Sequence, residues 1–146
     1  MKIIWLTGQP GSGKTEIAKE FIKNNPQWVN VDGDDIREIF NNKDYSMVGR
    51  INNIKLAQSI TEFLYKKGFN VIVSLVSPYR EIREEFKVKI GNDLIEIYLH
   101  TSEDRGKNHL HVINYEQPND NYIDFDTTNK TVDESVKILK SMIEFR

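Results

Sequence analysis

Gly8-Gln9-Pro10-Gly11-Ser12-Gly13-Lys14-Thr15 is the stretch of this chain that decides its fold. It matches the pattern G-x-x-x-x-G-K-[ST] at every fixed position. An apolar run, 3–6, precedes it and a helix-like run, 16–21, follows it. In such a strand–loop–helix unit, backbone N–H groups and the helix N-terminus bind a polyphosphate. We therefore expect Lys14 to reach the β and γ oxygens and Thr15 to ligate Mg²⁺. The residues expected to bind the nucleotide are Gly8, Gly11, Ser12, Gly13, Lys14 and Thr15.

The composition is that of an ordinary soluble globular protein. The chain has 146 residues, enough for one domain, 1–146, with one sizeable core. The net charge of −2 gives no electrostatic reason to expect binding to nucleic acid or to an anionic membrane. The absence of cysteine excludes disulfides and thiolate metal sites. No run is apolar enough to span a membrane and no signal peptide is recognisable, so we expect a cytoplasmic protein.

Apolar runs alternate with helical patterns, which is typical of a parallel sheet covered by helices on both faces. The predicted fold is α/β, a three-layer P-loop NTPase fold of the nucleotide-kinase type with a five-stranded parallel sheet. The predicted strands are 2–7, 28–31, 70–76, 94–99 and 122–125. The predicted helices follow the P-loop to about 25, then span 35–40, 48–67 and 79–89, and a last one runs from a capping box at Thr131 and Glu134 to the C-terminus. Residues 101–121 are polar and aperiodic, and we interpret them as a lid-like loop.

An acidic sequence, Asp32-Gly33-Asp34-Asp35-Ile36-Arg37, follows the second predicted strand. Ligands bind at the carboxyl ends of such strands, so Asp32 and Asp34 should lie near the γ-phosphate. Carboxylates there can hold Mg²⁺ or accept a proton from an attacking hydroxyl, and the sequence leaves open which does which. Arg37 shares a helical face with Asp34 and could bind an anionic part of a second substrate. Alternatively, Asp34 or Asp35 caps the short helix.

Further polar residues are expected at the same edge of the sheet. Arg50 and Asn53 are three residues apart in the long helix and share one face, either toward the cleft or toward solvent. Ser77 interrupts an apolar run just before a proline, where it could serve the site or a turn. Arg80 and Arg83 come next, and the alternative to a role in the site is surface pairing with Glu84 or Glu85.

Together these segments resemble the adenylylsulfate kinase family, whose members phosphorylate the 3′-hydroxyl of adenosine 5′-phosphosulfate with ATP. The matching segments, in chain order, are GQPGSGKT, VDGDDIR, RINN, VIVSLVSPYREIR, EIYL, YEQP and IDFDTT. The resemblance covers nearly the whole chain except residues 101–114. The P-loop alone is shared by many families, whereas the D-G-D-x-x-R and S-P-Y-R elements together are much more specific.

The resemblance implies a role for each matching residue. Asp32 and Asp34 would form the acidic pair at the reacting hydroxyl and the metal, with Thr15 and Asp32 holding Mg²⁺. Ser77 matches a serine sometimes proposed as a phosphoserine intermediate. In-line transfer needs no covalent step, so we expect Ser77 instead to hydrogen-bond the acceptor or to order its loop. The implied catalytic set is Lys14, Asp32, Asp34 and Ser77. The implied acceptor-binding set is Asp34, Arg37, Arg50, Asn53 and Ser77.

The lid-like loop departs from the family pattern. Members typically have a longer lid, with an R-D-x-K-G-L-Y stretch and an F-T-G-I-D stretch that clamp the two nucleotides. Arg105, Gly106 and Lys107 could stand in for the first stretch in changed order, so Arg105 is predicted to bind ATP. The phenylalanine of the second stretch has no counterpart, which leaves the acceptor's base open. His109 and His111 could face a phosphate or a base, or be exposed loop histidines.

The resemblance therefore predicts a Mg²⁺-dependent kinase that transfers the γ-phosphate of ATP to a small nucleotide acceptor. The expected acceptor is adenosine 5′-phosphosulfate or a similar conjugate. One alternative keeps the chemistry and changes the acceptor, for example to cytidine diphosphoramidate in capsule biosynthesis. Another is a nucleotide-binding module without kinase activity. The resemblance also suggests a homodimer.

Overall fold

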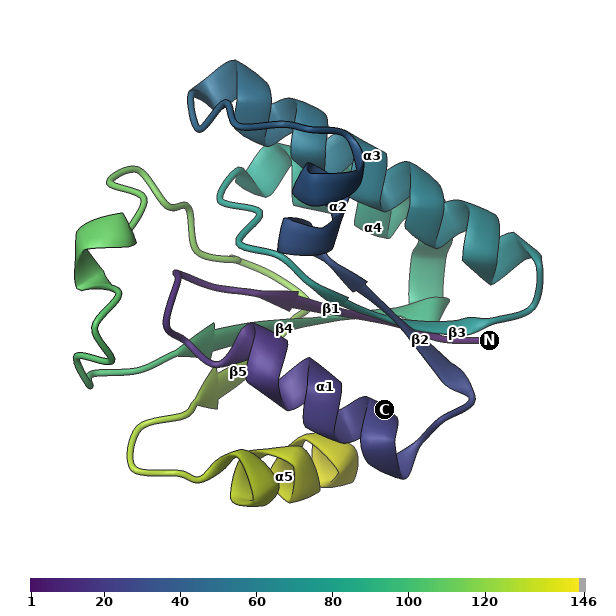
Figure 1. Ribbon diagram of the computed structural model, residues 1–146. Helices are drawn as coiled ribbons and strands as arrows, with labels where there is room; N and C mark the ends of the chain where they lie inside the picture. Colours follow the sequence, from purple (N-terminus) through teal and green to yellow (C-terminus); the bar gives the residue numbers. More distant parts are fainter. Residues whose placement is uncertain (145–146) are drawn as a thin grey trace.

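Five parallel strands form one sheet, and helices cover both of its faces (Figure 1). The computed structural model describes residues 1–144. The strands are β1 (Ile3–Thr7), β2 (Trp28–Asp32), β3 (Asn70–Ser74), β4 (Leu94–His100) and β5 (Ile123–Asp126). The helices are α1 (Lys14–Asn24), α2 (Gly33–Ile39), α3 (Met47–Lys66), α4 (Arg80–Ile90) and α5 (Val132–Glu144). Short 3₁₀ turns occupy Gly91–Asp93 and Asn108–Leu110.

The two faces of the sheet bury separate apolar clusters. Side chains alternate along a strand, so Ile4 and Leu6 of β1 point to one face and Ile3 and Trp5 to the other. The first pair packs with side chains of α1 and α5, and the second with side chains of α3 and α4. In Figure 1, α1 and α5 lie on one side of the sheet, and α2, α3 and α4 lie on the other. The predicted three-layer α/β fold is therefore confirmed.

The strand order, β2-β3-β1-β4-β5, places β1 in the centre of the sheet. It pairs with β3 on one side and β4 on the other. Because every pairing is parallel, the segments that follow β1, β2 and β3 all emerge at one edge. Ligands of open α/β sheets bind at this edge, next to the strand where the chain order reverses. The P-loop therefore lies beside the segments after β2 and β3.

Element boundaries differ from the sequence-based prediction in a few places. α2 begins at Gly33, two residues early, because the Asp32 carboxylate accepts the N–H of Asp34 and caps the helix. The alternative in which Asp34 or Asp35 is the cap is therefore wrong. β3 ends at Ser74 rather than at 76, and β5 spans 123–126 rather than 122–125. One half of the predicted capping box of α5 is present, since Thr131 Oγ1 accepts the Glu134 N–H over 3.1 Å; the Glu134 carboxylate accepts the Thr131 hydroxyl rather than its backbone N–H. The predicted end of α5 at 145–146 lies outside the described residues.

Candidate active site

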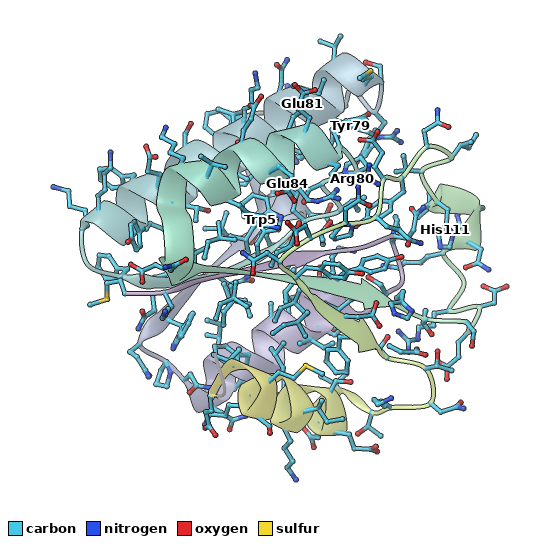
Figure 2. All side chains as sticks on the ribbon, turned by 180° about the vertical axis from the view of Figure 1, so that it is seen from behind. Trp5, Tyr79, Arg80, Glu81, Glu84 and His111 are labelled. Carbon is cyan, nitrogen blue, oxygen red and sulfur yellow. The ribbon has the colours of Figure 1, made fainter. Side chains whose placement is uncertain are left out.

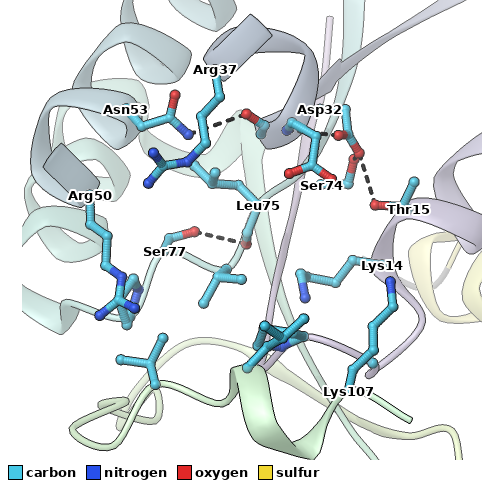
Figure 3. A pocket seen from close by; sticks show the side chains of 18 of the residues that line it. Lys14, Thr15, Asp32, Arg37, Arg50, Asn53, Ser74, Leu75, Ser77 and Lys107 are labelled. Atoms are coloured by element: carbon cyan, nitrogen blue, oxygen red, sulfur yellow. Dashed lines mark hydrogen bonds between the residues drawn. The ribbon is translucent and has the colours of Figure 1, made fainter. Parts of the chain in front are cut away.

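A cleft of about 530 Å³ opens at the carboxyl edge of the sheet (Figure 3). Its walls come from the P-loop, the starts of α2 and α3, the loop after β3, and part of the lid-like loop. The volume is in the range of small-molecule sites in proteins. The cleft brings together most of the predicted site residues: Gly11, Gly13, Lys14, Thr15, Asp32, Asp34, Arg37, Arg50, Asn53 and Ser77. Gly8, Ser12 and Arg105 do not line it.

Gly8 and Gly13 of the P-loop are needed for different reasons. A Cβ on Gly8 would lie 2.2 Å from the carbonyl oxygen of Leu99, so any side chain would displace β4. Gly13 has φ +105°, a left-handed conformation in which it is the N-cap of α1. The loop closes on itself through the N–H of Ser12, which donates to the Gln9 carbonyl over 3.1 Å. Gly8 and Ser12 thus shape the loop from behind the cleft.

The amine of Lys14 lies inside this loop and is poorly hydrated. Its Nζ donates to the carbonyl of Gln9 over 2.9 Å and to Ser12 Oγ over 3.2 Å. The pKa of Lys14 is lowered to about 7, mainly by burial and also by the charge of Lys107, while Asp32 and Asp34 oppose the shift. An anion that enters the cleft beside this amine stabilises its protonated, charged form.

The carboxylate of Asp32 is 5% exposed and fully engaged. Its Oδ1 accepts the N–H of Asp34, and its Oδ2 accepts the hydroxyls of Thr15 over 2.9 Å and Ser74 over 2.7 Å (Figure 3). By contrast, Asp34 is exposed in the cleft, and no donor among residues 1–144 hydrogen-bonds its carboxylate. The two acidic residues therefore differ in freedom: one is fixed to the P-loop and the other can move.

The Thr15 hydroxyl and Asp32 carboxylate are hard oxygen donors of the kind that Mg²⁺ prefers. They are already within hydrogen-bond distance of each other, so one ion could contact both. Within residues 1–144, no three His, Asp or Glu side chains gather at one point. The residues thus fit an ion that takes only one or two protein ligands and completes its shell with phosphate and water, as Mg²⁺ commonly does.

Cationic and aromatic residues line the end of the cleft opposite the P-loop. Arg37 Nη1 donates to the carbonyls of Asn42 and Asp44, and its guanidinium lies 4.0 Å from the ring centroid of Tyr45. Arg50 lines the same wall. The Tyr45 side chain lines the cleft, and the residue is 61% exposed. The sequence reasoning missed it, although an aromatic residue in the polar loop after Arg37 was an available signal.

Asn53 lies behind this wall and is 2% exposed. Its Nδ2 donates to the carbonyl of Gly33 over 3.3 Å, which ties α3 to the start of α2. Its Oδ1 has no hydrogen-bond partner among the described residues. Of the two alternatives for Arg50 and Asn53, the structure favours the cleft over a solvated face.

Ser77 lies on the floor of the cleft and is 1% exposed. Its hydroxyl donates to the carbonyl of Leu75 over 3.0 Å and accepts the indole N–H of Trp5 over 2.9 Å. Its φ of +42° is unusual for a residue other than glycine. A hydroxyl with both partners in place orders the loop after β3 better than it attacks a phosphate.

The alternative in which Arg80 and Arg83 pair at the surface with Glu84 or Glu85 is wrong. Figure 2 views the molecule from the side of α4 and labels Arg80 and Glu84. Arg80 Nε donates to the carbonyl of Gln117 over 2.7 Å. Arg83 is buried and pairs with Glu96 of β4, with Nε and Oε2 3.0 Å apart. The periodicity of α4 alone could not show that its Arg83 position faces a charged residue of the sheet.

Arg105 turns away from the cleft. Its Nη1 donates to the carbonyl of Gly11 and to the hydroxyl of Thr127, and its Nη2 donates to the Thr127 carbonyl. It thereby joins the outside of the P-loop to the segment after β5. Lys107 lines the cleft instead. His109 and His111 line it too, with His111 Nε2 lying 3.2 Å from the carbonyl oxygen of Pro10.

The comparisons with known proteins agree with this geometry. The family model described as adenylylsulphate kinase matches residues 1–121. The chain belongs to the adenylylsulfate kinase family. A probable adenylyl-sulfate kinase of Halalkalibacterium halodurans is 30% identical over 166 aligned positions, covering 97% of this chain and 80% of that protein. A cytidine diphosphoramidate kinase of Campylobacter jejuni is 35% identical over 101 positions, covering 66% of this chain and 59% of that protein.

The fold of this family member is also found in solved structures. An APS kinase of Mycobacterium tuberculosis, in complex with AMPPNP and APS, superimposes with a TM-score of 0.80 at 22% identity. The match covers 98% of this chain and 97% of that one, and at this identity it shows the fold alone. Several matches to curated adenylyl-sulfate kinases span little more than half of their length, 50% to 57%. No helix within residues 1–144 is both long and apolar enough to cross a membrane.

Proposed function

We propose that this protein transfers the γ-phosphate of ATP to the ribose 3′-hydroxyl of a small nucleotide conjugate, with adenosine 5′-phosphosulfate as the first candidate. One observation carries the proposal. A single cleft runs from the P-loop, past the exposed carboxylate of Asp34, to the cationic wall of Arg37 and Arg50. A donor triphosphate and an anionic acceptor can therefore occupy the same cleft with their reacting ends between them.

The donor half of the cleft would bind ATP through the P-loop. The N–H groups of the loop and the N-terminus of α1 would face the phosphates, and the Lys14 amine would neutralise charge that develops on the transferring group. Thr15 and Asp32 would hold Mg²⁺, which when bound supplies charge neutralisation at the β and γ oxygens. Lys107 brings a second cation from the lid-like loop to the same half. Arg105 supports this half indirectly, through the carbonyl of Gly11.

We assign the proton acceptor to Asp34 rather than to Asp32. A general base needs a free oxygen within reach of the attacking hydroxyl. Both oxygens of Asp32 already accept hydrogen bonds. Oδ1 accepts the N–H of Asp34, and Oδ2 accepts the hydroxyls of Thr15 and Ser74. The Asp34 carboxylate is exposed in the cleft between the two halves. It can turn toward an acceptor hydroxyl without breaking any bond that holds the fold.

A second candidate acceptor is cytidine diphosphoramidate. Two observations favour it: the relative from Campylobacter jejuni that carries this name, and the divergent lid-like loop. The exposed ring of Tyr45 offers a base a surface for stacking, and stacking on an aromatic ring tolerates either a purine or a pyrimidine. The phosphosulfate of the adenosine conjugate and the phosphate groups of the cytidine conjugate would both suit Arg37 and Arg50.

A panel of acceptors with radiolabelled ATP tests the proposal. Equal concentrations of adenosine 5′-phosphosulfate, cytidine diphosphoramidate, and the parent AMP and CDP are each incubated with protein and Mg²⁺, and labelled products are separated. We expect transfer to one conjugate and much less to its parent nucleotide. Transfer to the cytidine conjugate alone would assign the second candidate. Tight ATP binding with no transfer to any acceptor would contradict kinase activity and leave a nucleotide-binding module.

We also retain the homodimer suggested by the family resemblance as a proposal. Sedimentation velocity over a range of protein concentrations, with and without ATP, tests it directly. A species of 17.1 kDa at every concentration would contradict it.

A further inference from the structure

Three charged side chains lie between α4 and the sheet, away from the reacting groups. Arg83 and Lys87 come from α4 and Glu96 from β4, and both Arg83 and Glu96 are 2% exposed. Arg83 Nε donates to Oε2 of Glu96 over 3.0 Å, and Lys87 Nζ donates to Oε1 over 2.8 Å. Desolvation largely offsets the attraction within such a buried pair, and apolar residues often stabilise a fold as well. Stability alone therefore does not explain why these charges are here.

The remaining nitrogens of Arg83 hold two backbone segments. Nη1 donates to the carbonyl of Ser77, and Nη2 donates to the carbonyl of Glu116. Ser77 forms part of the cleft floor, and Glu116 belongs to the last part of the lid-like loop, which leads back to β5. A guanidinium is planar and presents its donors in a fixed fork, so the Glu96 contact sets the direction of the other two bonds. A lysine has no such fork.

The Ser77 conformation needs support from its surroundings. A left-handed φ, here +42°, costs a non-glycine residue about 1 to 3 kcal/mol unless other contacts hold it. Trp5 holds the side chain through its indole N–H, and Arg83 holds the carbonyl, to which the Thr7 hydroxyl also makes a long contact of 3.4 Å. Loss of the Arg83 contact would let this backbone relax and move the floor of the cleft next to Pro78.

The return segment, 115–117, packs against the same loop. The N–H of Glu116 donates to the carbonyl of Pro78 over 2.9 Å, and its Oε1 accepts the N–H of Arg80 over 2.8 Å. Arg83 is the buried charged side chain in this set of contacts, and residues 8–15 of the P-loop make no hydrogen bond to it. A change at Arg83 should therefore disturb the loop after β3 and the return segment while leaving the phosphate-binding end in place.

We propose that Arg83, held by Glu96, is a positioning residue for the acceptor half of the cleft, which Arg37, Arg50, Asn53 and Ser77 form. It fixes the left-handed Ser77 and the return segment in one arrangement and touches neither substrate. This inference rests on the proposed function only in naming the acceptor as the affected ligand. It predicts that the acceptor affinity depends on Arg83, whereas ATP affinity does not.

The test compares Arg83→Lys with Lys87→Met, in the presence of whichever acceptor the wild type phosphorylates. Arg83→Lys keeps a cation beside Glu96 and loses the fork. Lys87→Met removes the other cation on Glu96 and its hydrogen bond to the Asp120 carbonyl, and it leaves both carbonyl contacts of Arg83 intact. We expect Arg83→Lys to raise the acceptor KM at least about tenfold, because a small displacement of the groups that bind a substrate has a large effect on its binding and reaction. The Kd of a non-hydrolysable ATP analogue should stay within about twofold, because Arg83 makes no hydrogen bond to the P-loop. Lys87→Met should lower Tm and leave both the acceptor KM and the Kd of the ATP analogue unchanged.

An unchanged acceptor KM in Arg83→Lys would overturn the inference. An equal loss of acceptor and ATP affinity would also overturn it, because that pattern indicates general loosening. If Arg83→Lys does not fold, the double variant Arg83→Met with Glu96→Gln replaces it. Both charges are then removed together, which avoids leaving a buried carboxylate unpaired.

A readout without turnover separates this inference from the proposed function. The chain has two tryptophans, so a ¹⁵N NMR spectrum shows two indole signals, and Trp28→Phe identifies that of Trp5. We expect the Trp5 indole N–H to shift and to exchange faster in Arg83→Lys and to stay unchanged in Lys87→Met. An unchanged Trp5 signal in Arg83→Lys would overturn the positioning role even if no acceptor is phosphorylated. A shifted signal without turnover in the wild type would refute only the proposed function.

Discussion

The hydroxyl of Thr15 donates a hydrogen bond to Oδ2 of Asp32 over 2.9 Å. This bond joins the first residue after the P-loop lysine to the end of β2, and Ser74 of β3 donates to the same oxygen. Three neighbouring segments at the carboxyl edge thus share one carboxylate before any ligand enters. The donor half of the cleft is preorganised by this arrangement, and the difference between Asp32 and Asp34 follows from it.

The two acidic residues should respond differently to truncation. Asp32→Ala removes the cap of α2 and the acceptor of two hydroxyls, so we expect it to reduce the free energy of unfolding by about 2 kcal/mol and also to reduce turnover. Asp34→Ala should reduce kcat at least about a hundredfold with a stability change within about 0.5 kcal/mol. Urea unfolding and steady-state kinetics measure both, with the exposed Asp35→Ala as control. Normal turnover in Asp34→Ala would exclude it as the base.

Lys14→Ala should abolish most phosphoryl transfer. Removal of one preorganised donor to transition-state charge typically costs about a hundredfold or more in kcat. The fold should survive, because the amine is poorly solvated and bonds only within its own loop. Lys19→Ala changes an exposed lysine of the same helix and serves as the matched control. Near-normal turnover in Lys14→Ala, with circular dichroism unchanged, would contradict the assignment.

The buried Lys14 amine predicts a pH-dependent stability in the ligand-free protein. Burial lowers its pKa from 10.5 to about 7, so between these values the unfolded chain carries a proton on this amine that the folded chain lacks. The free energy of unfolding therefore rises with pH across this window. Lys14→Met has no such group. From about pH 7.5 to about pH 9, the free energy of unfolding of the wild type, measured with urea, should rise by about 1.4 kcal/mol per pH unit relative to that of Lys14→Met. A pH-independent difference would show that the amine keeps its ordinary pKa.

Ser77→Ala should reduce turnover less than about tenfold, because the hydroxyl orders a loop and its proton is already donated to Leu75. The change should also reduce stability by about 1 kcal/mol, since the buried indole N–H of Trp5 loses its acceptor. Mass spectrometry of wild type quenched during a single turnover should find no phosphoserine. A phosphorylated Ser77 peptide formed and consumed at the rate of turnover would restore the covalent intermediate.

The fold and the donor half of the site could be predicted from the sequence because their signals are local. The P-loop pattern lies in eight consecutive residues, and alternating apolar runs define the strands and helices around it. The carboxyl-edge rule then placed the acidic sequence after β2 next to the P-loop. Arg37, Arg50 and Asn53 were expected at the cleft from helical spacing and family resemblance, and the structure brings them there.

Only the tertiary structure decided what each side chain contacts within those elements. Asp32 caps α2 because its hydrogen bonds to Thr15 and Ser74 fix the direction of its carboxylate. Arg105 faces Thr127 rather than the cleft, which leaves Lys107 as the lid cation. Such contacts join residues far apart in the chain, and their partners depend on strand register and loop path.

The sequence by itself determined a P-loop kinase fold with an acidic pair and cations at one edge, because strong local periodicity and a contiguous motif encode those features. The tertiary structure alone decided that Arg83 of α4 pairs with Glu96 and donates a hydrogen bond to the Ser77 carbonyl. Helical periodicity gives the face on which Arg83 lies, but the identity of the residue opposite depends on how α4 crosses β4. A buried charge is tolerated only where that crossing supplies a partner.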